Sequence, residues 1–206
     1  MSLWDEAARE LLIRTASADP TPGGGSVAAL SGAFGLALVT MALAVTLRHQ
    51  EQEQPDLRTL HAETTALLLN MQPHPDADVL AFQGYMKALS SPKATAEEKS
   101  ARRTALYLAA QQATDVPLQA ARDLHSGLGL AQRAATAVKR EVVSDVGAGA
   151  ALLSGALQAI LFTVDINLGS LLPQARALAQ AERERLAQEG QERAGEVAEQ
   201  VAARLS

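Results

Sequence analysis

The chain of 206 residues contains no cysteine, and aromatic residues make up only 3% of it. Without cysteine there can be no disulfide, thiol nucleophile or thiolate metal ligand. Because 48% of the residues are nonetheless hydrophobic, alanine, leucine and valine must fill the interior, which favours closely packed helices. The chain also has no excess of basic residues, since 23 acidic residues outnumber 18 lysines and arginines and the net charge is −5. This charge argues against nucleic acid as a partner.

Strand-like alternation is also missing, and no internal repeat or linker divides the chain. We therefore predict an all-α fold, a single-domain helical bundle over residues 1–206. Residues 26–47 and 146–164 carry no charge and are rich in alanine and glycine. They predict two buried central helices, because a helix that is apolar all round lies in a large core or a subunit interface.

Three further expectations concern other helices. The first helix is expected to run to about residue 17, before Pro20. Thr95 and Glu98 predict a capping box at the start of a long helix. Pro117 should kink or restart that helix, and residues 125–129 predict a break in it.

The two uncharged stretches are long enough to raise the alternative of membrane insertion. Alanine, glycine, serine and threonine dilute both, and the mean hydropathy of the chain is only +0.01. We therefore expect no membrane association and predict that part of this apolar surface forms a homodimer contact. No charged segment followed by an apolar one opens the chain, so we predict a cytoplasmic protein.

A glycine-rich loop precedes the first uncharged helix and consists of Pro22, Gly23, Gly24, Gly25 and Ser26. Glycine lets a ligand approach the main chain closely, and the serine hydroxyl can cap the following helix. The unpaired N–H groups of that helix would then form a socket for an anion or an electron-rich ligand group. The alternative is a tight turn without a ligand.

Four further residues are candidates for chemistry. Asp145 precedes an apolar helix, where burial and helix N–H groups act on its carboxyl in opposite directions, and an N-cap is the alternative role. Asp78 and Phe82 share one face of a predicted helix over 76–90. Asn167 can present its amide to a ligand or cap the end of its helix.

Several common sites are not supported. The histidines at positions 49, 61, 74 and 125 lack metal-ligand spacing, so we predict no metal site. No nucleophile elbow is present, and the glycine loop lacks the Lys-Ser/Thr ending of a P-loop. We expect no prosthetic group.

Several motifs resemble the folate-dependent cyclodeaminase/cyclohydrolase family, which includes formiminotransferase-cyclodeaminase and methenyltetrahydrofolate cyclohydrolase. They occur in the family's order at residues 20–30 (PTPGGGSVAAL), 78–82 (DVLAF), 91–99 (SPKATAEEK), 115–118 (DVPL), 144–147 (SDVG) and 166–168 (INL). The resemblance covers roughly residues 3–173. It departs from the family pattern at 48–52, where a Lys/Tyr-rich patch is usual, and at 140–143, where an Asn-Pro pair is usual.

The resemblance implies a tetrahydrofolate substrate carrying a one-carbon unit. A cyclodeaminase closes the ring to 5,10-methenyltetrahydrofolate with loss of ammonia, whereas a cyclohydrolase adds water and opens that ring. Both reactions need proton transfer, for which we predict Asp145 as the main group and Asp78 as the supporting carboxylate. Ser144 joins the glycine loop, Phe82 and Asn167 as a predicted binding residue. The two departures leave open a non-catalytic binding or scaffold protein of the same fold.

Overall fold

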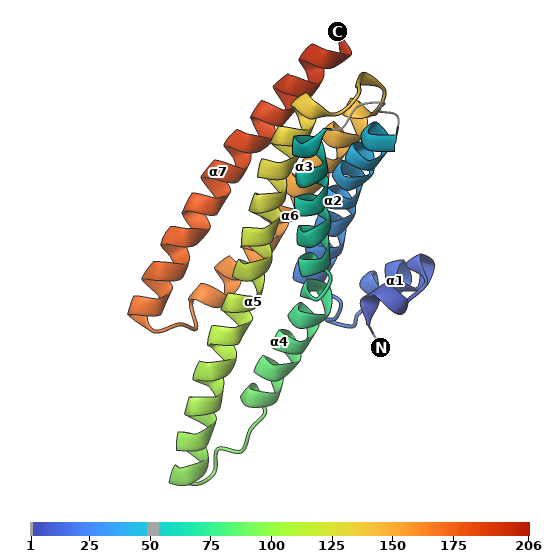
Figure 1. The fold of residues 1–206 in the computed structure, drawn as a ribbon. Coiled ribbons are helices and arrows are strands. Elements are labelled where there is room, and N and C mark those ends of the chain that lie inside the picture. Colours follow the sequence, from blue (N-terminus) through green and yellow to red (C-terminus); the bar gives the residue numbers. More distant parts are fainter. Residues whose placement is uncertain (1, 49–53) are drawn as a thin grey trace.

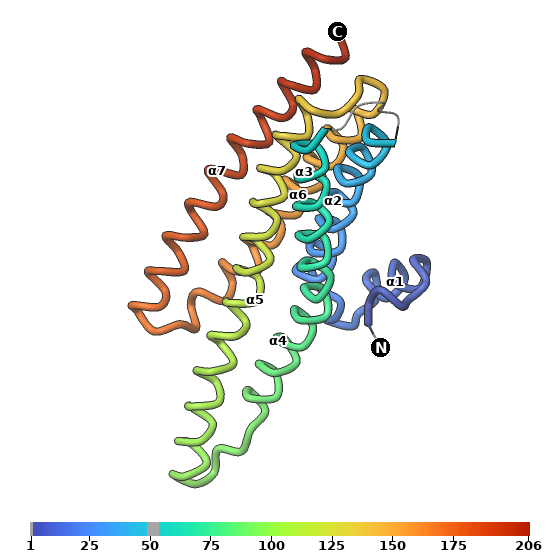
Figure 2. The backbone as a smooth tube through the Cα atoms, viewed as in Figure 1, coloured from blue at the N-terminus to red at the C-terminus, as the bar shows by residue number. Residues whose placement is uncertain are grey.

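The structure, a computed structural model, describes residues 2–48 and 54–206 (Figures 1 and 2). Within those residues it contains helices and no strand, as the sequence predicted. The elements are the short 3₁₀ helices η1 (Leu3–Asp5) and η2 (Arg140–Val142) and the α-helices α1 (Ala8–Thr15), α2 (Gly24–Arg48), α3 (Pro55–Met71), α4 (His74–Leu89), α5 (Ala96–Ala137), α6 (Val143–Leu168) and α7 (Pro173–Leu205).

Helices α2 and α6, which contain the two uncharged stretches, form the most extensive helix pair of the bundle and confirm the predicted central pair. Gly35 and Gly149 allow this contact, because a Cβ on Gly35 would lie 2.7 Å from the Gly149 carbonyl oxygen. Gly32, one turn earlier on α2, lies against Ala156 farther along α6. The two helices are therefore antiparallel, and the start of α2 lies beside the end of α6.

Helix α5 is longer and less interrupted than predicted. The sequence suggested a restart or kink at Pro117 and a break at 125–129, but the helix is continuous from Ala96 to Ala137. Gly127 serves packing instead, because a Cβ there would already lie 3.1 Å from a methyl carbon of Leu153. The start of α5 is as predicted, since the Thr95 hydroxyl accepts a hydrogen bond from the Glu98 N–H at 3.1 Å.

The N-terminal segment also differs from its prediction of one helix up to about residue 17. It folds as η1 followed by the eight-residue α1, which stands away from the bundle (Figure 1). Asp76 on α4 holds η1 by accepting a hydrogen bond from the Leu3 N–H at 2.8 Å. Helix α1 itself buries no residue and leaves Leu12 and Ile13 exposed.

Helix α7 packs along α5 and α6 through a sparse apolar stripe. Leu186 and Val197 are buried, and Gly190 lies against the Leu157 side chain. Arg183 donates hydrogen bonds to both carboxylate oxygens of Asp165 at 2.8 Å, and this ion pair links α7 to α6.

Two segments, Gly24–Arg48 and Arg140–Leu168, are long and apolar enough to cross a membrane by length and composition alone. About half of each is buried inside the bundle, 56% and 44% respectively. Buried core helices of soluble proteins pass the same test.

Candidate active site

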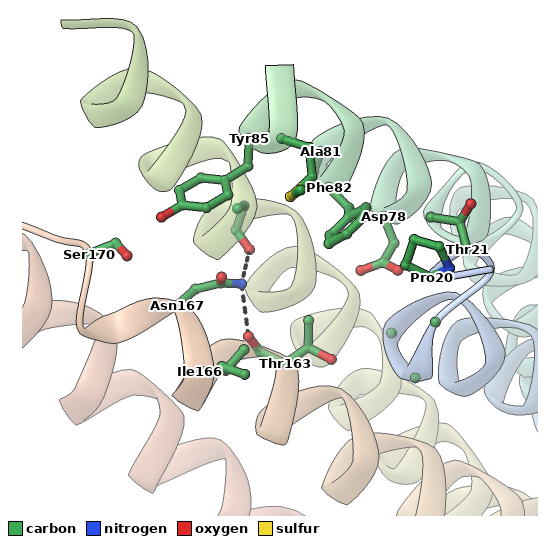
Figure 3. Close-up of a pocket in the computed structure, with 15 residues that line it drawn as sticks. Pro20, Thr21, Asp78, Ala81, Phe82, Tyr85, Thr163, Ile166, Asn167 and Ser170 are labelled. Atoms are coloured by element: carbon green, nitrogen blue, oxygen red, sulfur yellow. Dashed lines mark hydrogen bonds between the residues drawn. The ribbon is translucent and has the colours of Figure 1, made fainter. Parts of the chain in front are cut away.

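A cavity of about 450 Å³ lies where the start of α2, the middle of α4 and the end of α6 meet (Figure 3). The antiparallel α2–α6 pair brings the two helix ends together, and α4 closes the third side. Six of the predicted site residues line this cavity: Gly23, Gly24, Gly25, Asp78, Phe82 and Asn167. The sequence therefore identified residues from three separate segments that share one pocket.

The Asp78 carboxyl is the acidic side chain among the residues that line this pocket. The hydroxyl of Ser26, which is fully buried, donates a hydrogen bond to Asp78 Oδ2 at 2.7 Å. Burial raises the pKa of Asp78, although the hydroxyl and the backbone N–H of Ser26 act to lower it. A carboxyl with a raised pKa can hold a proton and release it to a bound ligand.

The close approach of Asp78 to α2 depends on Gly25. A Cβ on Gly25 would lie only 2.2 Å from Asp78 Oδ1. Helix α2 begins at Gly24, earlier than predicted, so Ser26 lies inside its first turn and is not its N-cap. The anion socket at the start of this helix is thus filled by the protein's own carboxyl. The glycine loop lines the pocket through Gly23, Gly24 and Gly25.

Asn167 faces the pocket from α6 with a fixed side-chain amide. Its Nδ2 donates to the main-chain oxygens of Ala113 at 2.7 Å and Thr163 at 2.9 Å (Figure 3). Both amide hydrogens are therefore used within the protein, and the amide oxygen is the atom available to a ligand. This geometry combines the two roles predicted for Asn167, because the amide both braces the helix and borders the pocket.

Apolar and aromatic side chains form much of the remaining wall. Tyr85 lies on α4 one turn after Phe82, and Met86 follows it, while Ile166 comes from α6. These wall residues were not among the predicted binding residues. The signal for Tyr85 was present, since positions 78, 82 and 85 lie on one helix face, but spacing alone does not separate a pocket wall from a core.

Four predicted site residues lie outside the pocket wall. Ser26 is buried behind Asp78, and Pro22 is also buried. Ser144 and Asp145 lie in the first turn of α6, whereas Asn167 is near its other end. Twenty-two residues of helix separate Asp145 from Asn167, a distance of about 33 Å. The structure therefore does not bring Asp145 and Asp78 together within one chain.

The described histidines do not assemble a metal site. His74 Nε2 lies 2.7 Å from Asp123 Oδ2, and His125 Nε2 lies 3.0 Å from a Glu189 oxygen without hydrogen-bond geometry. Among residues 2–48 and 54–206, no group of three or more His, Cys, Asp or Glu side chains is placed to hold a metal ion. His49 and most of the departing stretch 48–52 lie outside the described residues.

A half-open, partly apolar pocket with one desolvated carboxyl is typical of small-molecule sites. A sequence model of the formiminotransferase-cyclodeaminase family matches residues 7–188. The chain therefore belongs to this family, as the motifs in its sequence predicted.

Known relatives carry two different activities in their names. The chain is 37% identical to the methenyltetrahydrofolate cyclohydrolase of Methylorubrum extorquens over 130 residues, 62% of each protein. It is 35% identical to the formimidoyltransferase-cyclodeaminase of Sus scrofa over 127 residues, 61% of this chain and 24% of that enzyme. The matched region thus spans less than two thirds of either relative.

A solved structure shares the fold. The crystal structure of formiminotetrahydrofolate cyclodeaminase from Thermotoga maritima superposes with a TM-score of 0.85 and covers 98% of both chains. The sequence identity between the two is 22%. This likeness establishes the helical architecture.

Proposed function

We propose that the pocket binds a tetrahydrofolate with a formimino group on N5 and closes its ring to 5,10-methenyltetrahydrofolate, releasing ammonia. The observation that carries this proposal is the desolvated Asp78 carboxyl, held by Ser26 on the wall of a pocket built from family-like motifs. Family membership supports the folate substrate.

The reaction requires two proton movements at neighbouring nitrogens. N10 attacks the carbon of the protonated formimino group (–CH=NH2⁺) and loses its proton, and the departing amino group gains one further proton and leaves as ammonia, so that the positive charge stays on the methenyl product. A carboxyl beside the tetrahedral carbon can take part in both movements. Asp78 fits this role because burial favours its protonated form.

The size and lining of the pocket agree with a small ligand that contains ring systems. Its volume of about 450 Å³ falls within the range of small-molecule sites. Phe82 and Tyr85 offer aromatic surfaces, and the Asn167 oxygen offers a hydrogen-bond acceptor to ring N–H groups. A Cβ on Gly24 would meet no heavy atom within 4 Å, so the ligand can approach the main chain there.

A methenyltetrahydrofolate cyclohydrolase is the second candidate, and a specific observation favours it. The match to the Methylorubrum extorquens cyclohydrolase covers 62% of that protein, whereas the matches to the vertebrate enzymes cover 23–28% of theirs. Water would add to the methenyl carbon in that reaction, and the same Asp78 carboxyl would serve the ring opening.

One pair of assays separates the candidates. Methenyltetrahydrofolate absorbs in the near ultraviolet, so a cyclodeaminase raises the absorbance when it is given 5-formiminotetrahydrofolate, with one ammonia per turnover. A cyclohydrolase lowers the absorbance when it is given methenyltetrahydrofolate. Binding of either folate without turnover would support the non-catalytic alternative, and absence of binding would refute the folate assignment.

We propose a cytoplasmic setting for this activity, with the folate as substrate and no prosthetic group. We also propose that the active form is a homodimer without membrane or nucleic acid.

A further inference from the structure

We propose that His74 is a positioning residue for the pocket: its hydrogen bond to Asp123 fixes α4 on α5 and thereby sets the place of Asp78. The link between this position and turnover rests on the proposed function. The effect of His74 on the Asp78 carboxyl can be measured without any folate, so the two proposals can fail separately.

His74 is the first residue of α4, and its ring contacts α5. His74 Nε2 lies 2.7 Å from Asp123 Oδ2. A carboxylate accepts hydrogen bonds, so the ring donates from Nε2. The side chains of the pair are only 11% and 16% exposed. Gln119, one turn earlier on α5, supports the same carboxylate through its other oxygen, because its Nε2 donates to Asp123 Oδ1 at 3.4 Å.

A pair of this kind suits the fixing of register better than it suits stability. A buried polar pair adds little net stability over well-packed apolar side chains of similar volume. It does restrict the arrangement of the two helices, because any slide that breaks it leaves a shielded carboxylate unpaired. Apolar contacts between helices have no preferred direction and resist such a slide less.

The pair lies one helical turn before the carboxyl of the pocket. His74 and Asp78 are four residues apart on α4 and so lie on one side of the helix, about 6 Å apart along its axis. A second polar contact between α4 and α5 lies at the far end of α4, where exposed Arg102 donates to the Leu89 main-chain oxygen at 3.0 Å. The position of Asp78 along α5 is therefore set mainly by His74.

Helix α5 holds both walls of the pocket. Its Asp123 binds His74 of α4. Its Ala113 main-chain oxygen accepts a hydrogen bond from Asn167 of α6 at 2.7 Å (Figure 3). The ten residues between these two points belong to one continuous helix and span about 15 Å. Asp78 and Asn167 thus line the pocket at places fixed against the same element, and loss of the His74 contact would release the first while the second stays held.

A small shift of α4 should affect proton transfer more than binding. Proton transfer requires Asp78 within hydrogen-bond reach of the reacting nitrogen, and a misplacement of about 1 Å costs on the order of 10²-fold in rate. The apolar wall residues tolerate such a shift because their contacts have no preferred direction. A loosened α4 should also admit water to Asp78. Because burial is the main cause of the raised pKa of Asp78, that pKa should fall.

Substitutions at His74 test the effect on turnover, with the folate that the wild type converts. His74→Ala should lower kcat about 10²-fold and change KM by no more than a few-fold. His74→Gln should restore most of the lost kcat, because its side-chain amide nitrogen lies as far along the side chain as Nε2 and can donate to Asp123. The matched control is His61→Ala on α3, which should keep wild-type kcat. Within the described residues, the His61 ring makes no hydrogen bond or ion pair, and it lies outside the pocket wall.

The pKa of Asp78 gives a readout that needs no folate. Carbon-13 NMR of protein labelled at its aspartate carboxyl carbons follows the titration, and Asp78→Asn assigns the signal. We expect the pKa of Asp78 to be lower in His74→Ala than in the wild type and to return in His74→Gln. A pair that serves stability alone would lower the melting temperature of His74→Ala but leave kcat and the pKa of Asp78 unchanged, which would overturn the positioning role.

A double variant keeps the test valid if His74→Ala does not fold. Joint replacement of His74→Leu and Asp123→Leu exchanges the pair for apolar side chains, which is often neutral for stability. The folded double variant should show the same loss of kcat and the same fall in the pKa of Asp78. Wild-type values of both would overturn the inference. A wild type inactive on both folates, with the pKa of Asp78 still lowered by His74→Ala, would instead refute the proposed function and leave the positioning of Asp78 standing.

Discussion

The substitution Gly25→Ala tests whether the placement of Asp78 controls turnover. The added methyl carbon would lie 2.2 Å from Asp78 Oδ1, whereas ordinary contact begins at 3.4 Å. Asp78 must therefore move by about 1 Å, which disrupts its 2.7 Å hydrogen bond from Ser26. A displacement of about 1 Å at a catalytic group costs on the order of 10²-fold in rate.

The same substitution should have a small effect on folding. Loss of a hydrogen bond that leaves a buried polar group unpaired costs about 1–3 kcal/mol, and alanine regains up to about 1 kcal/mol of helix propensity. We therefore expect the free energy of unfolding to fall by no more than about 2 kcal/mol, while turnover falls about 10²-fold. Turnover is measured by methenyltetrahydrofolate absorbance, and unfolding by urea titration followed by circular dichroism.

Gly84→Ala is the matched control for this experiment. Gly84 lies on α4, the helix that carries Asp78, but is exposed, and a Cβ there would meet nothing within 4 Å. This variant should keep wild-type turnover and gain about 0.5–1 kcal/mol of stability. If Gly25→Ala also keeps turnover within a few-fold of wild type, the position of Asp78 does not limit the reaction and the reasoning fails.

Three further predictions concern the pocket and the bundle. Gly24→Val should abolish folate binding, measured by titration calorimetry, because the valine side chain enters open pocket space. Helicity and melting temperature should stay nearly unchanged. Lowered stability with intact binding would mean that the loop is purely structural. Gly35→Ala should destabilise the fold by about 1–3 kcal/mol in urea titration, because its Cβ would lie 2.7 Å from a main-chain oxygen on α6, whereas Gly195→Ala in open space should not. Burial raises the pKa of Asp78, so ionisation of its carboxyl costs folding stability. The melting temperature of the wild type, compared with that of Asp78→Asn, should therefore fall as the pH rises above 3.8 and then level off. A difference between the two melting temperatures that is independent of pH would contradict the raised pKa.

The sequence was sufficient for most of the helices because their ends are marked by local chemistry. The Thr95–Glu98 capping box begins α5, and Pro55 and Pro173 stand at the starts of α3 and α7. Composition indicated the central helices, since uncharged stretches rich in alanine and glycine can only be covered by other helices. These features depend on residues close together in the chain.

Features that depend on distant contacts were not predictable in the same way. Gly127 looks like a helix break in isolation, and only its contact with Leu153 shows that it serves packing. Ser26 looks like an N-cap until Asp78 is placed beside it. For Asp145, the motif indicated importance, but a sequence does not give distances, so its separation from the pocket required the fold.

The pocket is assembled from opposite ends of two long antiparallel helices, which determines where the chain tolerates insertions and deletions. One extra residue inside α2 or α6, on the pocket side of Gly35 or Gly149, would turn the distal end by about 100° and shift it by about 1.5 Å. The glycine loop and Asn167 would then no longer face each other, even if every side chain were kept. The α4–α5 loop carries no such constraint, so length variation among family members should collect in loops and be absent from these two helices.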